Sequence, residues 1–331
     1  MKSHISRRNV LKVAGGGAAL AALGMPSILR AQGTYPDRPI NIIVPFATGG
    51  YNDRLARAFA PYLQAELGQP LVIVNQPGAG AQLGHTYALQ QPMDGYSILC
   101  TSAAPYIPLN ILLQNAPYKA EDFHMINLPS RDYTLAATSA DSEITDMKQV
   151  IDRLKEDPGS LSLGVQPASA DYANLILTLQ KAGVPTDSLR LVTYDGGGPA
   201  RNATAGGQVD VGFVGGEGFL TLKDKIKPLA IYADEAPEWW PDAPTLKDAG
   251  VETDFVEGSQ RGWVVPTALT KEQPEIYAKI EGAVKAASQK PEAVEALEKQ
   301  ELATRWYGPE ESNKAYLANF QKMSTYVDLL K

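Results

Sequence analysis

The sequence predicts an α/β protein built from two lobes with a ligand cleft between them. Short apolar runs of strand length alternate with segments of helical periodicity along most of the chain. The runs carry no polar alternation, which is typical of largely parallel strands that are covered on both faces. Two such series followed by a helical tail indicate two lobes, and a cleft between lobes is a favoured location for a small-ligand site.

The N-terminal segment is set apart from the fold because it has the pattern of an export signal. Arg7 and Arg8 precede a weakly apolar stretch, residues 13–29, and Ala31 is a small residue near the expected cleavage point. A membrane anchor is the alternative, but seventeen residues with four glycines are short and only mildly apolar. We expect a twin-arginine signal peptide over residues 1–31 and export to the periplasm.

The composition argues against several classes of function. Without residues 1–31 the chain keeps 25 basic and 37 acidic side chains, a net charge near −12, which repels nucleic acid and anionic membranes. Cys100 is the only cysteine, so an intrachain disulfide is impossible, and its apolar neighbours favour a buried inert thiol. His4, His85 and His124 are the only histidines and form no cluster with metal-ligand spacing, so we expect no metal and no cofactor.

The first series contains strands and helices in alternation. The expected strands are residues 40–46, 71–74 and 97–101, and the expected helices are residues 52–67 and 82–91. The first of these helices is closed by Gly68, and Pro61 inside it predicts a kink or a later start.

The second series begins after Phe123 and ends in a helical tail. Its expected strands are residues 161–165, 189–193, 209–214 and 226–232, and its expected helices are residues 171–181 and 198–205. A short apolar segment then precedes three helices, which are expected over residues 271–289, 291–302 and 311–330. The two lobes are therefore predicted as residues 34–127 together with 258–331, and residues 128–257.

The corner after the first strand has the features of an anion site. Gly49 and Gly50 permit positive φ and close backbone approach, and Asn52 or Asp53 is expected to cap the following helix. Free N–H groups and the helix dipole favour an anion there, either a nucleotide phosphate or a small carboxylate. An ordinary tight turn between strand and helix is the alternative explanation.

A second glycine-rich corner, after the second strand, tests the nucleotide explanation. Gly78, Gly80 and Gly84 are spaced one residue too far apart for a dinucleotide fingerprint. Thr101 and Ser102 stand where an acidic residue would bind a ribose. These features argue against a nicotinamide cofactor, whereas a nest of N–H groups for a smaller anion remains compatible with them.

A third corner, in the second lobe, places three glycines after a strand, next to Tyr194 and Asp195. It lacks the Gly-Lys-Ser/Thr ending of a P-loop, so it is another candidate nest for a small anion. Farther along, Asp210 is compatible with contact to ligand-bound water or with a structural role at the start of a strand.

Six sequence blocks in a fixed order carry a family resemblance. They are YPDRPINIIVPFATGGYNDRLAR, LGQPLVIVNQPGAGAQLG, DGYSIL, PYKAEDF, YDGGGPARNATAGGQVDVGF and PDAPTLKDAGV. Because of these blocks the chain resembles the periplasmic solute-binding proteins of tripartite tricarboxylate transporters, the Bug family, over nearly its whole mature length.

The resemblance implies a two-lobed periplasmic-binding-protein (Venus-flytrap) fold, a small carboxylate ligand, and membrane transporter subunits as partners of a monomer. It also implies that two loops hold the carboxylate largely through N–H groups, hydroxyl groups and water. Carried onto this chain, these loops supply Thr48, Gly49, Gly50, Tyr51, Asn52, Asp53, Gly78, Ala79, Gly80, Ala81 and Gln82. We expect further ligand contacts from Thr101, Ser102, Ser169, Tyr194, Asp195, Gly196 and Arg261.

Several residues depart from the family pattern. Tyr51 stands where the family usually has a small residue, so its ring is expected to face the cleft and tune which carboxylate fits. The alternative is that the ring points to solvent or packs against its own helix. Gln166 and Pro167 occupy unusual places, and Arg261 is expected either to reach a second carboxylate or, as we favour, to be a surface arginine.

The sequence contains no recognisable catalytic constellation. Neither G-x-S-x-G nor H-E-x-x-H occurs, and Ser102 and Ser169 have no identifiable base partner. We therefore expect a binding protein that captures a small carboxylate and delivers it to a tripartite tricarboxylate-type transporter, and not an enzyme. The first alternative is a ligand-sensing partner of a sensor kinase. The second, which ranks below it, is an enzyme that acts on a small carboxylate.

Overall fold

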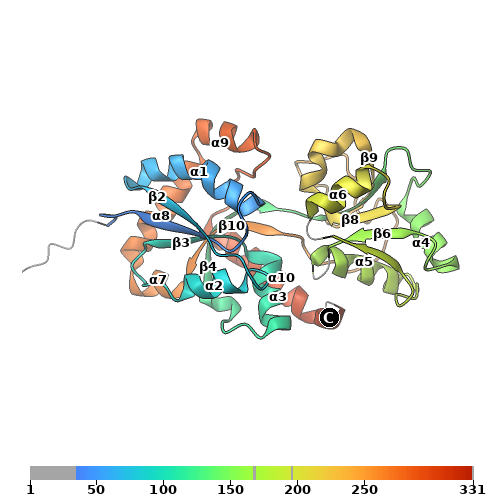
Figure 1. Ribbon diagram of the computed structural model, residues 1–331, viewed down its shortest axis with the longest axis horizontal. Coiled ribbons are helices and arrows are strands. Elements are labelled where there is room, and N and C mark those ends of the chain that lie inside the picture. Colours follow the sequence, from blue (N-terminus) through green and yellow to red (C-terminus); the bar gives the residue numbers. More distant parts are fainter. Residues whose placement is uncertain (1–34, 167–168, 195–196, 330–331) are drawn as a thin grey trace, which may run out of the picture. The chain divides into compact units, whose positions relative to one another are not determined.

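Two five-stranded sheets with their covering helices make up the fold (Figure 1). The computed structural model describes residues 35–166, 169–194 and 197–329, and the fold considered below is that of Arg38–Lys331, which form one compact unit. The first sheet has the strand order β2-β1-β3-β10-β4 and the second β7-β6-β8-β5-β9. Each sheet with its helices is called a lobe here; the residue bounds predicted for the lobes stay a prediction.

The first lobe is formed by both ends of the chain. Its strands are β1 (Ile40–Val44), β2 (Leu71–Asn75), β3 (Ser97–Ser102), β4 (Phe123–Arg131) and β10 (Gln260–Pro266). Its helices are α1 (Tyr51–Leu67), α2 (Gln82–Leu89), α3 (Ala103–Gln114), η1 (Ala120–Asp122), α7 (Thr267–Glu272), α8 (Pro274–Ser288), α9 (Pro291–Glu298) and α10 (Gly308–Thr325).

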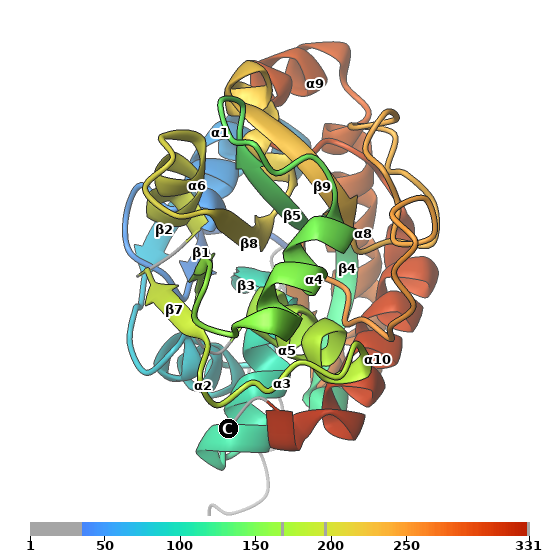
Figure 2. The same cartoon turned by 90° about the vertical axis from the view of Figure 1, so that its right-hand side faces the viewer.

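The second lobe is formed by the middle of the chain. Its strands are β5 (Thr134–Ser139), β6 (Ser162–Val165), β7 (Arg190–Thr193), β8 (Val211–Gly215) and β9 (Ile226–Ile231). Its helices are α4 (Met147–Glu156), α5 (Ala170–Lys181), α6 (Gly197–Ala205) and η2 (Glu217–Lys225). Figure 2 shows α4 and α5 together in front of the second sheet. The C-terminal turn η3 (Val327–Leu329) contacts α5.

Both sheets are mixed, and the expectation of largely parallel strands is wrong for half of the pairings. β1 is parallel to β2 and β3, and β6 is parallel to β7 and β8. β10 is antiparallel to β3 and β4, and β5 is antiparallel to β8 and β9. Two parallel neighbouring strands need a crossover connection, usually a helix, between them. The chain reaches β5 and β10 from the other lobe and not through such a crossover within the same sheet, so these two strands can run antiparallel to their neighbours.

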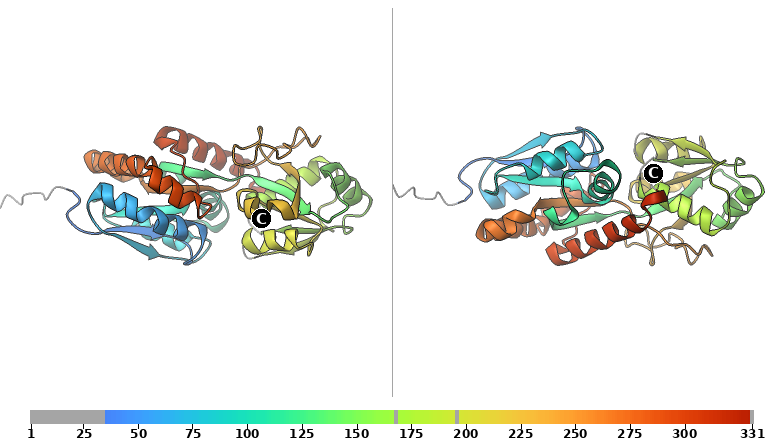
Figure 3. Two further views of the ribbon diagram at one scale, coloured as in Figure 1. Left: turned by 90° about the horizontal axis from the view of Figure 1, so that it is seen from above. Right: turned by 90° about the horizontal axis from the view of Figure 1, so that it is seen from below.

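The first lobe buries both faces of its central strands. On β10, the Trp263 ring packs against Phe59 of α1 with 5.0 Å between ring centroids. The next residue, Val264, belongs to a buried cluster on the opposite face that includes Ile107 of α3 and Tyr316 of α10. Neighbouring side chains of a strand point to opposite faces, which explains why β10 is apolar from Trp263 to Pro266. Figure 3 shows the helices on the two faces of this sheet.

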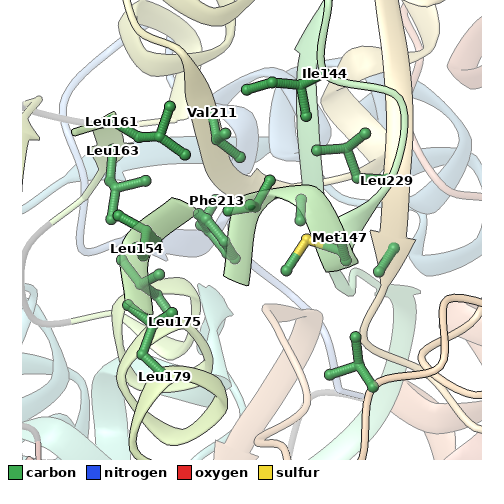
Figure 4. Close-up of a cluster of buried hydrophobic side chains, with 14 of the residues drawn as sticks. Ile144, Met147, Leu154, Leu161, Leu163, Leu175, Leu179, Val211, Phe213 and Leu229 are labelled. Carbon is green, nitrogen blue, oxygen red and sulfur yellow. The ribbon is translucent and has the colours of Figure 1, made fainter. Parts of the chain in front are cut away.

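The second lobe has its main core between the sheet and the helices α4 and α5. Figure 4 shows this cluster, in which Leu154 of α4 and Leu175 of α5 lie close to Leu163 and Phe213 of the sheet. The other face of the same sheet buries a second cluster against α6 and η2, which contains Phe219. Both faces of the second sheet are therefore also covered.

Several helices differ from the sequence-based expectation. The segment expected as one helix over residues 271–289 forms α7 and α8, because Pro274 takes the first position of α8, where its missing N–H needs no acceptor. α1 continues past Pro61, so this proline does not delay its start. α9 ends at Glu298, and α10 begins at Gly308.

Two further expectations concern single residues and the membrane. Cys100 is buried, as expected, and burial raises the pKa of its thiol above the ordinary value. Within the described parts of the chain, none of the helices combines the length and the apolarity that a membrane crossing needs.

Candidate functional site

A cavity of about 730 Å³ has walls that come from both lobes. Its volume is typical of pockets for small molecules. The first lobe contributes the corner before α1 and the junction of β3 with α3, and the second lobe contributes the N-terminal ends of α5, α6 and η2. Three further wall residues, Asp132, Gly258 and Ser259, lie at the two places where the chain passes between the lobes, where the N–H of Asp132 donates to the carbonyl of Ser259 at 2.9 Å.

The N-terminus of α1 opens onto this cavity without a side-chain cap. Gly50 is the N-cap, so the expected cap at Asn52 or Asp53 is wrong, and both residues belong to the first turn. The first helical hydrogen bond runs from the N–H of Arg54 to the Gly50 carbonyl at 2.9 Å. The N–H groups before it have no acceptor within the helix. Gly49 has φ +86°, which explains the glycine at this position.

Asp53 holds the corner in shape and does not line the cavity. It is buried and accepts hydrogen bonds from the N–H of Gly49 at 2.8 Å and from Arg57 and Asn75 at 3.0 Å. Although burial raises the pKa of Asp53, these hydrogen bonds outweigh it and hold the pKa below the ordinary value. The carboxylate therefore supports the loop from behind.

Asn52 has an unsatisfied polar atom on the cavity wall. It is 4% exposed, and its Nδ2 donates to the Ser102 hydroxyl at 2.9 Å, whereas its Oδ1 is buried and has no partner among the described residues. If the amide is turned over, Ser102 donates to Oδ1, and Nδ2 becomes the free donor. In either orientation a ligand or its water is needed to satisfy Asn52.

Tyr51 and Arg261 contact each other on the same wall. The guanidinium of Arg261 lies 4.6 Å from the centre of the Tyr51 ring, and the Tyr51 hydroxyl accepts a hydrogen bond from the N–H of Ala303 at 3.1 Å. Burial, followed by the nearby Glu217, raises the pKa of Tyr51 above its ordinary value. The ring thus lies on the wall of the cavity; its effect on ligand choice stays a prediction.

Arg261 is not a surface residue, and our preferred expectation for it is wrong. Its side chain is only 15% exposed and forms ion pairs with Asp132 at 3.3 Å and Glu217 at 3.2 Å. It also donates to the Ser130 hydroxyl at 3.0 Å. β10 places Arg261 between β3 and β4, and the two acids come from the crossing after β4 and from the start of η2.

Five charged side chains from both lobes line the cavity, and we call them the charged cluster: Asp132, Asp171, Arg201, Glu217 and Arg261. Burial, and then the neighbouring Asp132, raises the pKa of Glu217 to about 7, although Arg261 opposes this change. Burial raises the pKa of Asp171 to about 6 against the hydrogen bond that it accepts from Thr134 at 2.7 Å. The cavity therefore contains carboxyl groups that titrate near neutral pH.

Glycines make room for the charged cluster. A Cβ atom at Gly215 would lie 2.3 Å from Oδ2 of Asp132, and one at Gly218 would lie 2.3 Å from Cζ of Arg201. At Gly197 it would lie 2.7 Å from Nη1 of Arg201. The glycine-rich stretches around these positions thus keep space for charged side chains, a role that we did not predict.

The remaining predicted residues of the second lobe have separate positions. Ser169 lines the cavity as the N-cap of α5, accepting from the N–H of Tyr172 at 3.1 Å. Tyr194 packs against the cluster beneath α6 and is not a wall residue. Asp210 accepts from Ser162, with 2.7 Å to its N–H and 2.6 Å to its hydroxyl, so its role is structural. The predictions for Pro167, Asp195 and Gly196 lie outside the described residues.

The second glycine corner does not reach the cavity wall. Of the predicted residues, the structure places Gly49, Gly50, Tyr51, Asn52, Ser102, Ser169 and Arg261 on the wall, and it places elsewhere Thr48, Asp53, Gly78, Ala79, Gly80, Ala81, Gln82, Thr101 and Tyr194. Thr101 is buried and its hydroxyl lies 2.8 Å from Nε2 of His85. Burial lowers the pKa of His85 to about 4, so this histidine is a neutral residue of the core.

Comparisons with known sequences identify a family over most of the chain. Residues 55–325 match the family described as "Tripartite tricarboxylate transporter family receptor", and residues 4–24 match the signal sequence of the twin-arginine translocation pathway. "Protein BugT" of Bordetella pertussis is 27% identical over 288 residues, 86% of each chain. A "UPF0065 protein in gbd 5'region" of Cupriavidus necator is 30% identical over 305 residues, 90% of each chain.

Solved structures confirm the two-lobed fold. A solute-binding protein of this family from Polaromonas, without ligand, has a TM-score of 0.73 at 23% identity, covering 89% of this chain and 99% of its own. MatC from Rhodopseudomonas palustris with bound malate has a TM-score of 0.68 at 24% identity, covering 90% and 100%. Another R. palustris protein, with adipate, has a TM-score of 0.67 at 20% identity, covering 89% and 98%.

Proposed function

Because this chain belongs to the family of tripartite tricarboxylate transporter receptors, we propose that its cavity captures a small carboxylate and that the loaded protein delivers it to membrane transporter subunits. The protein is a periplasmic solute-binding protein with a twin-arginine signal peptide. Malate and adipate in two structures of the same fold support a carboxylate as the class of ligand here.

One observation carries the proposal: the uncapped N-terminus of α1 opens onto the cavity beside the unsatisfied amide of Asn52. Free N–H groups and the positive end of the helix dipole attract an anion. With the amide turned over, Nδ2 of Asn52 adds one more donor, and the Ser102 hydroxyl fixes its direction. A carboxylate at this point satisfies all of these donors together.

The test compares a charge placed at two helix N-termini. Asn52→Asp keeps the shape of the side chain and adds a negative charge at α1, whereas Gln82→Glu adds the same charge at the N-terminus of α2, away from the cavity wall. A calorimetric screen of mono-, di- and tricarboxylates against the mature protein identifies the ligand. We expect Asn52→Asp to weaken its binding about tenfold or more, equivalent to about 1.4 kcal/mol, and Gln82→Glu to leave it unchanged.

Matched uncharged ligands complete the test. Replacing the bound carboxylate by its amide removes the charge that the helix N-terminus favours, so the amide is expected to lose most of the affinity. Equal affinities for acid and amide would reject the proposal. So would a stronger loss in Gln82→Glu than in Asn52→Asp, because the anion would then lie at the second corner.

A further inference from the structure

Arg201 is a cavity-wall arginine whose donors are mostly unused. It lies on α6, and its guanidinium occupies space that Gly197 and Gly218 leave open. Its Nη1 donates to the Gly215 carbonyl at 3.3 Å, a long hydrogen bond. In the part of the chain that the structure describes, no carboxylate lies within ion-pair distance of it. A guanidinium has five N–H donors, so most of them lack an acceptor among the described residues.

The neighbouring acids are held by other groups. Asp132 pairs with Arg261 and accepts from the N–H groups of Tyr133 and Glu217, both at 2.9 Å. Glu217 pairs with Arg261 as well and accepts from the Ser130 hydroxyl at 2.9 Å. Arg261 is therefore neutralised by two acids, and Arg201 is the arginine of the charged cluster that remains available to a ligand.

The unused donors of Arg201 open into the cavity. Arg201 lines its wall, and none of its nitrogen atoms is among the atoms that are both buried and without a partner. Burial lowers the pKa of Arg201, but a guanidinium stays protonated in proteins. Ser169 and Ala170, at the N-terminus of α5, belong to the same wall. This end of the cavity therefore offers the Arg201 guanidinium with free donors, beside the carboxyl group of Asp171, which accepts from the Thr134 hydroxyl at 2.7 Å.

We propose that Arg201 sets ligand specificity by binding a second acidic group, while the first carboxylate of the same ligand lies at the N-terminus of α1. This inference rests on the proposed function. The planar fork of a guanidinium matches the two oxygen atoms of a carboxylate, and such charge-assisted pairs are stronger than neutral hydrogen bonds. A ligand with acidic groups at both ends thereby contacts both lobes, whereas a monocarboxylate leaves Arg201 unpaired.

The test measures the preference for two acidic groups over one. Calorimetry on the mature protein compares succinate with butanoate, glutarate with pentanoate, and adipate with hexanoate. We expect at least one dicarboxylate to bind tenfold or more tightly than its partner of equal carbon number. In Arg201→Gln this preference is expected to fall below threefold, with the affinity for the monocarboxylate little changed. The matched control is Arg54→Gln, because Arg54 also lines the cavity but donates to the Gln300 carbonyl at 3.0 Å.

The outcomes separate this inference from the function on which it rests. If no carboxylate binds the wild-type protein, the proposed function fails. If carboxylates bind but both members of each pair bind alike, or Arg201→Gln weakens them equally, only the role of Arg201 is overturned. Should Arg201→Gln not fold, as judged by circular dichroism, Arg201→Lys replaces it. The lysine variant is expected to show a reduced preference, and an unchanged preference would overturn the proposal.

Discussion

At the scale of single residues, Glu217 connects the charge of the cavity with the stability of the fold. Its pKa rises from 4.5 to about 7, chiefly through burial and then through the nearby Asp132. Between these two pH values the folded state binds more protons at this carboxyl than the unfolded state does. Stability from this group is therefore fully present below pH 4.5 and is lost as the pH rises through 7. The raised pKa of Asp171 has the same effect: the stability from this carboxyl group is lost as the pH rises through about 6.

Glu217→Gln is expected to flatten this pH dependence. The amide cannot ionise, so the variant avoids the cost of a buried charge above pH 7, which is on the order of 2–3 kcal/mol. We expect the Tm of the wild-type protein to fall more between pH 5 and pH 8 than the Tm of Glu217→Gln. Glu310→Gln, at an exposed glutamate of α10, is the control. Parallel Tm curves for wild type and Glu217→Gln would contradict the assignment.

Single residues also show where sequence-based prediction reached its limit. Gly50 and Asn52 were predictable because a glycine pair before a helix pattern is a local signal. The role of Arg261 was not, because its partner Asp132 is 129 residues away along the chain. Arg201 and Glu217 were also missed, because the assembled fold and not the local sequence brings them to the cavity wall.

At the scale of elements, the sequence-based expectation left out the strands β4 and β5 and the helices α3 and α4, whereas most of the other strands matched their predicted runs. Strands such as β1 and β8 are continuous apolar runs between turns. α3 was missed because Pro105 and Pro108 interrupt its pattern and most of its residues up to Asn110 are buried, which leaves no polar face to give a helical period. The antiparallel direction of β10 could not be predicted from the sequence either, because it depends on the chain returning to the first sheet from the second lobe.

The glycines before and within α2 have backbone and packing reasons that do not involve an anion. Gly78 and Gly80 have φ values of +137° and +56°. A Cβ atom at Gly84 would lie 2.5 Å from Cβ of Pro45 and 2.7 Å from the carbonyl oxygen of Gln76. Gly84 thus allows α2 to pack directly on the corner that follows β1.

Gly84→Ala is expected to destabilise the protein without changing ligand affinity. Overpacking against rigid backbone costs about 1–3 kcal/mol, so we expect the Tm to fall by several degrees. Gly282→Ala on α8 is the control, because a Cβ atom there has no neighbour within 4 Å, and alanine is expected to stabilise that helix by about 0.5–1 kcal/mol. A Gly84→Ala protein as stable as the wild type would show that α2 can move away from the corner.

At the scale of the whole molecule, the two lobes share one cavity and are joined by only two passages of the chain in the described range, at residues 132–133 and 257–259. The charged cluster draws on both passages, because Asp132 lies on the first and Arg261 is the second residue of β10, just after the second passage. The fold class could be predicted from local patterns, whereas this convergence is a property of the assembled fold.

Export concerns the whole chain and has its own test. Arg7 and Arg8 lie within the matched twin-arginine signal. Replacing both by lysine keeps the charge and removes the recognised pair, so we expect the precursor to accumulate in the cytoplasm and the periplasmic yield to fall strongly. Fractionation followed by immunoblotting measures this, with Lys2→Arg as the control. An unchanged periplasmic yield of the double variant would exclude the twin-arginine route.

The single buried cysteine makes this protein convenient for optical measurement. The Cys100 thiol is fully enclosed and burial opposes its ionisation, so thiol-reactive dyes leave the native chain unlabelled. Exposed positions such as Gln64 on α1 and Lys155 on α4 accept new cysteines without removing an old one. With a donor dye on one lobe and an acceptor dye on the other, the efficiency of fluorescence energy transfer reports the distance between the lobes. A change in this efficiency then measures whether ligand binding or release alters that distance.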